Sequence, residues 1–324
     1  MQIIDRRKLI ACGAALMLGR WRTGRGAEPA PPPAIPVPAN WQRAPRLPIW
    51  PDKPPGSESF APPPPPADWP ASYVRAIAVP ELRVFRPSRP NGRSVLVMPG
   101  GAYWFVSVVN EGAELAPRLT ARGYTVFVLT YRLPGEGWAA RADVPLQDAQ
   151  RALRVIRQRA ATYGLDAARV AALGFSAGGH LAATLATRHS ERTYDALDAA
   201  DRLDARPWAT GLIYPVITLR DPWTHELSRR LLLGEHPSRE QIDRRSAELH
   251  VDTATTPLFL CHAMDDTAVP VENTVRMMNA MREAHRPVET HLLQEGDHAF
   301  GIGRPGTPSA LWIDLFCAWL ERTS

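Results

Sequence analysis

The chain has 324 residues, of which 45% are hydrophobic and 22% charged, so it can form one large α/β domain or two small ones, with a sizeable core. Its formal net charge is +5, but it has no long basic run and no basic segment interleaved with aromatics, which argues against nucleic-acid binding. It has only three cysteines and no CxxC pair, which argues against a disulfide framework. We expect Cys261 and Cys317, in apolar runs, to be buried free thiols.

Residues 1–27 are predicted to be an export signal. A basic start at residues 6–8 precedes an apolar stretch, residues 9–18, that is too short to span a membrane and suits a signal peptide. The sequence DRRKLI resembles a bacterial twin-arginine export signal. The interpretation is a protein exported to the periplasm or secreted, with no membrane span in the mature chain. Lipidation at Cys12 is the alternative, although little apolar sequence precedes it.

Residues 28–71 form a proline-rich segment. The chain has 33 prolines, about twice the usual ~5% share. Proline at this density favours extended chain, so the segment is predicted to be a tether or a strip lying on the domain surface. Trp41, Trp50 and Trp69 are candidates to hold it there. Residues 72–324 then form the catalytic domain.

From residue 72 onward, apolar strand patterns alternate with helical patterns. Strands that are apolar throughout and alternate with helices predict a mostly parallel central sheet with helices on both faces, an α/β fold. Such sheets hold their ligands beyond the carboxyl ends of the strands. The predicted strands lie at 93–100, 124–132, 169–176, 209–216, 257–264 and 289–296, and the predicted helices at 111–122, 144–164, 177–188, 271–285 and 308–322.

Ser176 lies where a predicted strand meets a predicted helix, in the sequence LGFSAGGH. Gly174, Ser176 and Gly178 match the pattern G-x-S-x-G, in which the turn is so sharp that side chains two residues away from the serine would collide. This geometry lifts the hydroxyl out of the sheet and directs the first helix amides at the site. Ser176 is therefore predicted to be a nucleophile, and the alternative is a glycine-rich turn with an incidental serine.

A serine hydroxyl needs a base, and the base needs an acid to orient it. In this fold the partners follow the serine along the chain, after later strands. His298 follows the last predicted strand and is the predicted base. Asp265 and Asp266 follow the preceding strand, and because adjacent side chains point in different directions we favour Asp266 as the acid. Asp297 is expected to be solvated.

Backbone amides are the predicted donors to the oxyanion that would form. Gly100 and Gly101 follow the first predicted strand, where paired glycines let amides face a site without an intervening side chain. The N–H of Ala177 is the other expected donor. Tyr103 and Trp104 would shape the acyl or alcohol pocket, or would only pack in the core; both interpretations stay open.

The motifs together resemble the α/β-hydrolase superfamily, in the acetyl-xylan-esterase-like and feruloyl-esterase-like branch whose members are often labelled xylanase. The resembled family has the pattern H-x-x-x-D-x-x-V-P. In this chain His262 and Pro270 frame Asp266 in that pattern, which supports Asp266 as the acid. Many esterase relatives have His-Gly-Gly-Gly where this chain has PGGA at 99–102. The resemblance covers about residues 46–322 and rests on LPIWPDKPPG, VLVMPGGAY, NEGAELAPRLTARGY, LTYRLP, DAQRALRVIRQRA, LGFSAGGHLAATLAT, IYPVITL, HAMDDTAVPVENT and GDHAFG.

The resemblance implies a serine esterase that cleaves a short acyl group, such as acetyl, from a carbohydrate ester, without a metal or cofactor. The rivals are a serine peptidase of related fold, a glycoside hydrolase, which needs two opposed carboxylates, and a non-catalytic carbohydrate-binding protein. His180, one helical turn after Ser176, is expected to pack or to hydrogen-bond. Residues 224–252 are predicted to be a helical insertion over the site, a candidate lid.

Overall fold

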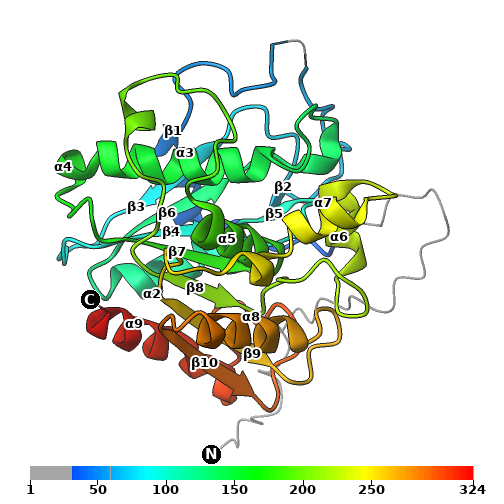
Figure 1. Ribbon diagram of the computed structural model, residues 1–324. Coiled ribbons are helices and arrows are strands. Elements are labelled where there is room, and N and C mark those ends of the chain that lie inside the picture. The colour runs from blue at the N-terminus through cyan, green and yellow to red at the C-terminus, as the bar shows by residue number, and fades with distance from the viewer. Residues whose placement is uncertain (1–30, 59, 324) are drawn as a thin grey trace, which may run out of the picture.

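The computed structural model describes residues 31–58 and 60–323, so the predicted export signal lies outside the described residues. Its centre is an eight-stranded sheet (Figure 1) in the order β1-β3-β6-β4-β7-β8-β9-β10. All neighbours from β6 to β10 are parallel, whereas β3 is antiparallel to both β1 and β6. The strands are β1 (Arg46–Pro48), β3 (Glu81–Phe85), β4 (Ser94–Met98), β6 (Thr125–Thr130), β7 (Val170–Phe175), β8 (Thr210–Ile213), β9 (Leu258–Ala263) and β10 (Val288–Leu293).

Helices cover both faces of this sheet, which confirms the predicted fold class. One face carries α3 (Val144–Gln158), α5 (Ser176–Arg188) and α8 (Glu272–Glu283), and the other carries α2 (Leu115–Thr120) and α9 (Trp312–Arg322). β2 (Tyr73–Val74) and β5 (Val106–Ser107) form a separate antiparallel pair. The remaining short elements are α1 (Ala39–Arg43), η1 (Val109–Ala113), η2 (Pro134–Glu136), α4 (Ala160–Tyr163), η3 (Ala199–Arg202), α6 (Glu226–Leu233), α7 (Arg239–Arg244), η4 (Ala247–His250) and η5 (Pro308–Leu311).

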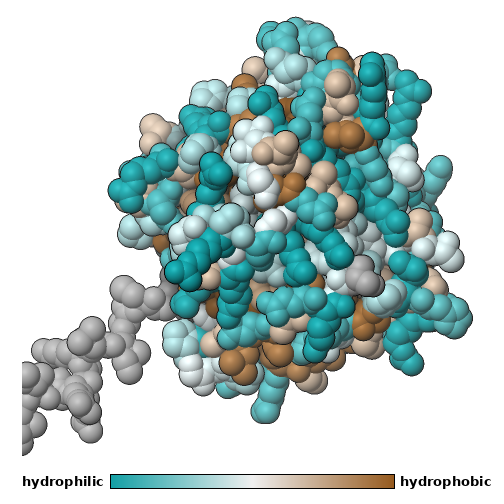
Figure 2. All heavy atoms as spheres, turned by 90° about the vertical axis from the view of Figure 1, so that its left-hand side faces the viewer, coloured by the Kyte–Doolittle hydropathy of each residue, from teal (hydrophilic) through white to brown (hydrophobic). Residues whose placement is uncertain are grey.

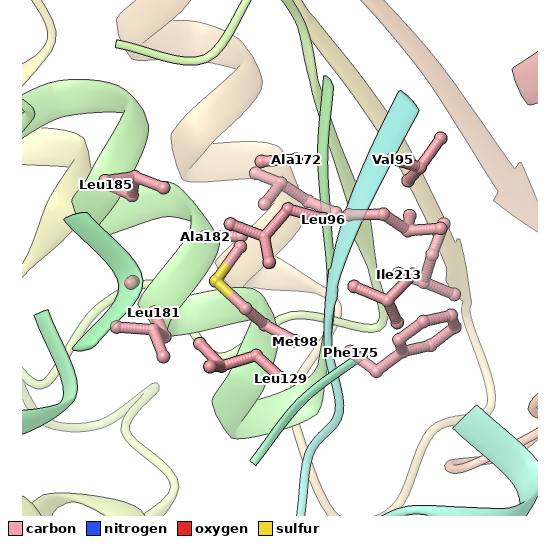
Figure 3. Packing of buried hydrophobic residues seen from close by; sticks show 14 of the residues in the cluster. Val95, Leu96, Met98, Leu129, Ala172, Phe175, Leu181, Ala182, Leu185 and Ile213 are labelled. Carbon is pink, nitrogen blue, oxygen red and sulfur yellow. The ribbon is translucent and has the colours of Figure 1, made fainter. Parts of the chain in front are cut away.

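The central strands are buried on both faces, as their apolar sequences require. In Figure 3 the side chains of Leu96 and Met98 on β4 point towards Leu181 and Ala182 on α5, whereas Val95 points to the opposite side of the sheet. Burial of each large apolar side chain contributes about 1.5–3 kcal/mol. This packing fixes the start of α5 against the ends of β4 and β7, where the site lies.

The described part of the proline-rich segment lies against the domain. Its β1 adds an edge strand to the sheet beside β3. Trp41 and Trp50 are buried, and the Trp50 indole N–H donates to Asp148 at 2.8 Å. The contacts fit a surface-lying strip better than a free tether, and the domain boundary at residue 72 stays a prediction.

The face of the molecule drawn in Figure 2 is mainly polar. On the face drawn in Figure 2, hydrophilic side chains predominate and hydrophobic ones occur in small separate groups. None of the helices within residues 31–58 and 60–323 is long and apolar enough to cross a membrane. Cys261 and Cys317 are buried and unbridged, as expected.

Candidate active site

Ser176 occupies the sharp turn between β7 and α5. Its φ is +50°, in the left-handed region, and its side chain is nearly buried. A Cβ at position 174 would lie 2.2 Å from the Gly178 carbonyl oxygen, and one at position 178 would lie 2.1 Å from the Met98 carbonyl oxygen. Because real side-chain atoms do not approach so closely, both positions require glycine. The strained serine is held by close backbone packing on both sides.

Three side chains far apart in the sequence form one hydrogen-bonded chain. The Ser176 Oγ lies 2.9 Å from His298 Nε2, and His298 Nδ1 lies 2.6 Å from Asp266 Oδ2. Since an ionised carboxylate can only accept, Nδ1 carries the proton and Nε2 is free to accept from the serine hydroxyl. His298 follows β10 and Asp266 follows β9, so both reach the site from the carboxyl edge of the sheet. The arrangement can deprotonate Ser176.

The electrostatic surroundings keep Asp266 ionised and make the His298 imidazole a stronger base. Burial disfavours the imidazolium, but the neighbouring Asp266 carboxylate outweighs it and raises the pKa of His298 above its ordinary value. For Asp266, burial acts against the carboxylate, but His298 and His262 outweigh it and hold its pKa far below its ordinary value. Asp266 is therefore ionised wherever the protein is folded at ordinary pH.

Asp266 has further partners that fix its orientation. Its Oδ1 accepts from the Ala268 and Val269 amides at 2.9 and 2.8 Å, and its Oδ2 accepts from His262 Nε2 at 3.0 Å. The Thr274 hydroxyl lies 2.8 Å from His262 Nδ1. Sequence reasoning used His262 only as a marker of the motif and missed this contact.

The two neighbouring aspartates have other partners. Asp265 is exposed, and its carboxylate accepts from the Asp297 amide at 2.8 Å. Asp297 is half-buried, not fully solvated as expected, and has a left-handed φ of +56°. Asp265 thus contacts the backbone of the His298 loop, whereas Asp266 contacts the imidazole.

The predicted oxyanion donors divide into two groups. The Gly100 amide donates to the Glu111 carboxylate at 2.6 Å, so the expectation that it faces the site is wrong. The Ala177 amide belongs to the first turn of α5, whose N–H groups lack intrahelical acceptors. Gly101 has a φ of +125° in the turn beside Ser176. Ala177 and Gly101 remain the candidate donors.

Tyr103 and Trp104 are both buried, so packing accounts for much of their environment. The Tyr103 hydroxyl lies 2.8 Å from His180 Nδ1, and His180 Nε2 donates to the Arg245 carbonyl at 2.6 Å. His180 therefore packs and hydrogen-bonds, as expected, and burial lowers its pKa to about 4. A substrate-binding role for Tyr103 and Trp104 stays a prediction.

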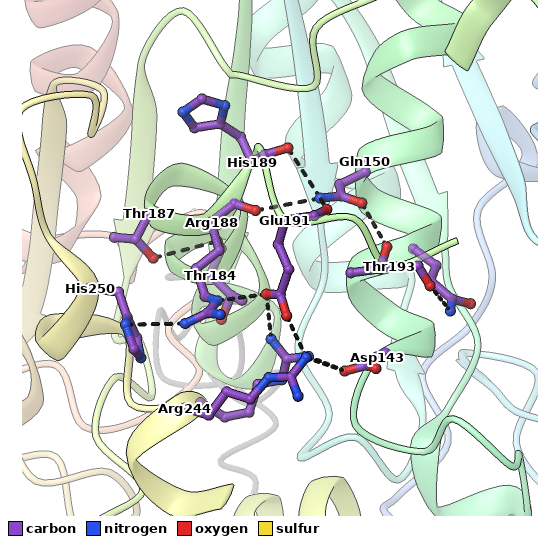
Figure 4. A network of polar contacts seen from close by, with 12 residues as sticks. Asp143, Gln150, Thr184, Thr187, Arg188, His189, Glu191, Thr193, Arg244 and His250 are labelled. Atoms are coloured by element: carbon purple, nitrogen blue, oxygen red, sulfur yellow. Dashed lines mark hydrogen bonds and ion pairs between the residues drawn. The ribbon is translucent and has the colours of Figure 1, made fainter. Parts of the chain in front are cut away.

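The segment 224–252 contains α6, α7 and η4, in line with the helical insertion expected there. Figure 4 shows part of the polar network that ties it to the loop after α5. Glu191 accepts from Arg188 at 2.6 Å and from Arg244 at 2.5 Å, and the buried Arg245 pairs with Asp143 and Glu191. The end of the segment is therefore anchored, and its role as a lid stays a prediction.

Glu111 and Tyr214 are the other site residues that sequence reasoning missed. Glu111 is buried, and burial raises its pKa to about 6 against the opposing effect of its hydrogen bonds. Tyr214 packs its ring against that of His298, with 5.0 Å between the ring centroids. Within the part of the chain that the structure describes, no group of three or more His, Cys, Asp or Glu residues could hold a metal.

Comparison with known proteins places the chain in a recognised family. Residues 82–281 match the BD-FAE family. The crystal structure of an acetyl ester-xyloside bifunctional hydrolase from Caldicellulosiruptor lactoaceticus is similar, with a TM-score of 0.72 and 31% identity over 86% of this chain and 96% of that one.

Two curated relatives are similar in sequence. An acetylxylan esterase from Xylanibacter ruminicola is 30% identical over 69% of this chain and 44% of its own length. Endo-1,4-beta-xylanase B from Butyrivibrio fibrisolvens is 35% identical over 64% of this chain and 32% of its own length. The chain thus spans less than half of either relative.

Proposed function

This chain belongs to the BD-FAE family, and on that premise we propose that it is a serine hydrolase of carboxylic esters. Ser176 is the nucleophile, His298 the general base and acid, and Asp266 the residue that orients the imidazole. The observation that carries the proposal is the hydrogen-bonded chain between them, with distances of 2.9 and 2.6 Å. These separations lie within the range that proton transfer requires.

The reaction follows from this geometry in two halves. His298 takes the proton from Ser176 as the oxygen attacks the acyl carbon, and the amides of Ala177 and Gly101 donate to the oxyanion that develops. His298 then gives the proton to the departing alcohol, which leaves an acyl group on Ser176. Water attacks the acyl carbon with His298 again as base, which releases the acid and restores the serine.

The substrate class we propose is an acetylated carbohydrate such as acetylated xylan. Its support is the activity named for two similar proteins, an acetylxylan esterase and an acetyl ester-xyloside bifunctional hydrolase. The relative named a xylanase matches this chain over only 32% of its own length, so that name gives little support to glycoside cleavage here. A peptidase or a carbohydrate-binding role becomes the alternative only if ester cleavage fails.

We also propose that the chain is exported and that residues 72–324 form the catalytic domain, to whose sheet the preceding segment adds the edge strand β1. The basic start at residues 6–8 and the apolar stretch at 9–18 support export. The test is to express the full-length gene in a bacterial host and sequence the N-terminus of the protein found outside the cytoplasm. Cleavage near residue 27 is expected, and an intact N-terminus in the cytoplasm would contradict export.

The experiment that tests the function compares the purified protein with Ser176→Ala. The matched control is Ser88→Ala, an exposed serine in the loop after β3. Acetate release from acetylated xylan and hydrolysis of 4-nitrophenyl acetate are both measured. Loss of both activities only in Ser176→Ala supports the proposal. Cleavage of the synthetic ester without acetate release from xylan would keep the esterase and reject the substrate, and no cleavage of either would reject the esterase.

A further inference from the structure

Glu111 connects two parts of the site that are separate in sequence. It lies in η1, a π-helical turn, a type of turn that occurs often at functional sites. Its Oε2 accepts from the Gly100 amide at 2.6 Å, and its Oε1 accepts from the Tyr214 hydroxyl at 2.9 Å. Each carboxylate oxygen is therefore used by a different segment of the chain.

The Gly100 bond acts on the oxyanion side of the site. A Cβ placed on Gly100 would lie 2.8 Å from the Ser176 Cβ, which shows how near this backbone is to the nucleophile. The preceding carbonyl, that of Pro99, accepts from the Tyr131 hydroxyl at 2.7 Å. With Pro99 and Gly100 both held, the orientation of the next amide, that of Gly101, is restricted.

The Tyr214 bond acts on the side of the base. Tyr214 follows β8, and its hydroxyl oxygen accepts from the Gly301 amide at 3.1 Å. Its ring packs edge-on against the rings of His298 and Phe300, with centroid distances of 5.0 and 4.5 Å. The Gly301 carbonyl accepts from the Trp312 indole N–H at 2.9 Å. Tyr214 thus supports the His298 loop by both its ring and its hydroxyl.

We propose that Glu111 is a positioning residue that holds the oxyanion turn at Gly100 and, through Tyr214, the His298 loop in one fixed arrangement. This inference rests on the proposed function. Glu111 acts through other residues and does not touch the substrate. The proposal predicts that a change to the Glu111 carboxylate alters both the oxyanion turn at Gly100 and the His298 loop.

The chemistry of the site requires two acceptors at position 111. An ionised carboxylate supplies two accepting oxygens, whereas a glutamine supplies one acceptor and one donor. In Glu111→Gln the amide can keep the Gly100 bond only by turning its NH₂ group towards Tyr214, whose own hydroxyl proton then loses its acceptor. Tyr214→Phe removes the hydroxyl and leaves the Gly301 amide without its partner.

The kinetic test uses Glu111→Gln, Tyr214→Phe and the double variant. The matched control is Glu114→Gln, an exposed glutamate three residues along the same segment. We expect Glu111→Gln to lower kcat by about 10- to 100-fold with little change in KM, less than the ~10²–10³-fold loss on removing an oxyanion donor outright. We expect the double variant to lose less than the product of the two single losses, because both act on one network.

A second measurement separates positioning from stability and does not depend on activity. Amide hydrogen exchange is followed at the 99–104 turn and the 297–301 loop in each variant. Glu111→Gln and Tyr214→Phe should both raise exchange in the 297–301 loop, and Glu114→Gln should not. Exchange that rises only within η1, or a kcat equal to that of wild type, would overturn the inference. If wild type itself has no Ser176-dependent esterase activity, the proposed function fails, and the exchange result still decides whether the two segments are coupled.

Discussion

Replacing Asp266 by asparagine should reverse the tautomer of His298. The Ala268 and Val269 amides both donate to Oδ1 of Asp266, at 2.9 and 2.8 Å. In Asp266→Asn these two donors hold the side-chain oxygen at that position, so the NH₂ group must face His298 Nδ1. His298 then accepts at Nδ1 and carries its proton on Nε2, where it can no longer accept from Ser176.

The size of the loss follows from this geometry. An enzyme whose catalytic histidine has the wrong tautomer loses about 10³–10⁴-fold in kcat. This loss is equivalent to about 4–5.5 kcal/mol of transition-state stabilisation. KM should change little, because the substrate is bound before the proton moves. Folding should survive, since asparagine has the shape of aspartate and keeps both backbone bonds. The His262 Nε2–H loses its bond to Oδ2 but still has the Val269 carbonyl at 3.1 Å.

The assay is steady-state hydrolysis of 4-nitrophenyl acetate by Asp266→Asn and, as the matched control, Asp265→Asn. The Asp265 carboxylate accepts from the Asp297 amide at 2.8 Å, and an asparagine oxygen can accept the same bond. Its variant should therefore stay within a few-fold of wild type. A large loss in Asp265→Asn with a small one in Asp266→Asn would refute the assignment of the acid.

Three further results are expected. Since imidazolium cannot accept the serine proton, kcat/KM should fall as pH drops through the pKa of His298, which lies above the ordinary value of about 6.5. The folding stability that the His298–Asp266 ion pair contributes has the opposite pH dependence. It is fully present below about pH 6.5 and is lost as pH rises through the raised pKa. In Gly178→Ala the new Cβ would meet the Met98 carbonyl at 2.1 Å, so kcat should fall and urea unfolding should show about 1–3 kcal/mol of lost stability. Arg132→Met leaves the fully buried Asp148 without its 2.9 Å ion pair and should cost about 3–5 kcal/mol in the same unfolding assay.

Each of these has a clear contrary result. An acid limb of the pH profile with its midpoint at or below about 6.5 would mean that Asp266 does not raise the pKa of His298. Wild-type activity in Gly178→Ala would mean that the turn can relax without moving the site. The exposed pair of Arg192 and Asp195 is the control for Arg132, because exposed pairs contribute about 0–1 kcal/mol. Equal losses at both sites would contradict the burial argument.

The sequence predicted what depends on local pattern and chain order. The strand before Ser176 and the helix after it fix the place of the serine, and the later strand ends fix the neighbourhood of His298. Both strands β1 and β3 were missed, because β1 lies in a proline-rich segment and β3 is short and half-exposed on part of its length. Because β1 and β3 pair antiparallel at the edge of the sheet, the chain there does not alternate strand with helix, which is the pattern that identified the other strands.

The sequence did not predict contacts that depend on the direction of single groups. The Gly100 amide was expected to face the site, but it donates to Glu111, and no composition rule gives the direction of one amide. Glu111 itself lies in a stretch that has a helical pattern, and its partner Tyr214 is 103 residues away in the sequence. Side-chain pairs at that separation become visible only once the sheet has brought the strand ends together.

The most direct test of the central claim is covalent labelling with a fluorophosphonate, a reagent that reacts with an activated serine. The full protein is treated with the reagent, and its mass is measured intact and after digestion. The account predicts one adduct per chain, on Ser176, formed much more slowly in Asp266→Asn and absent in Ser176→Ala. An unlabelled wild-type protein, or an adduct on another residue that Ser176→Ala retains, would contradict it.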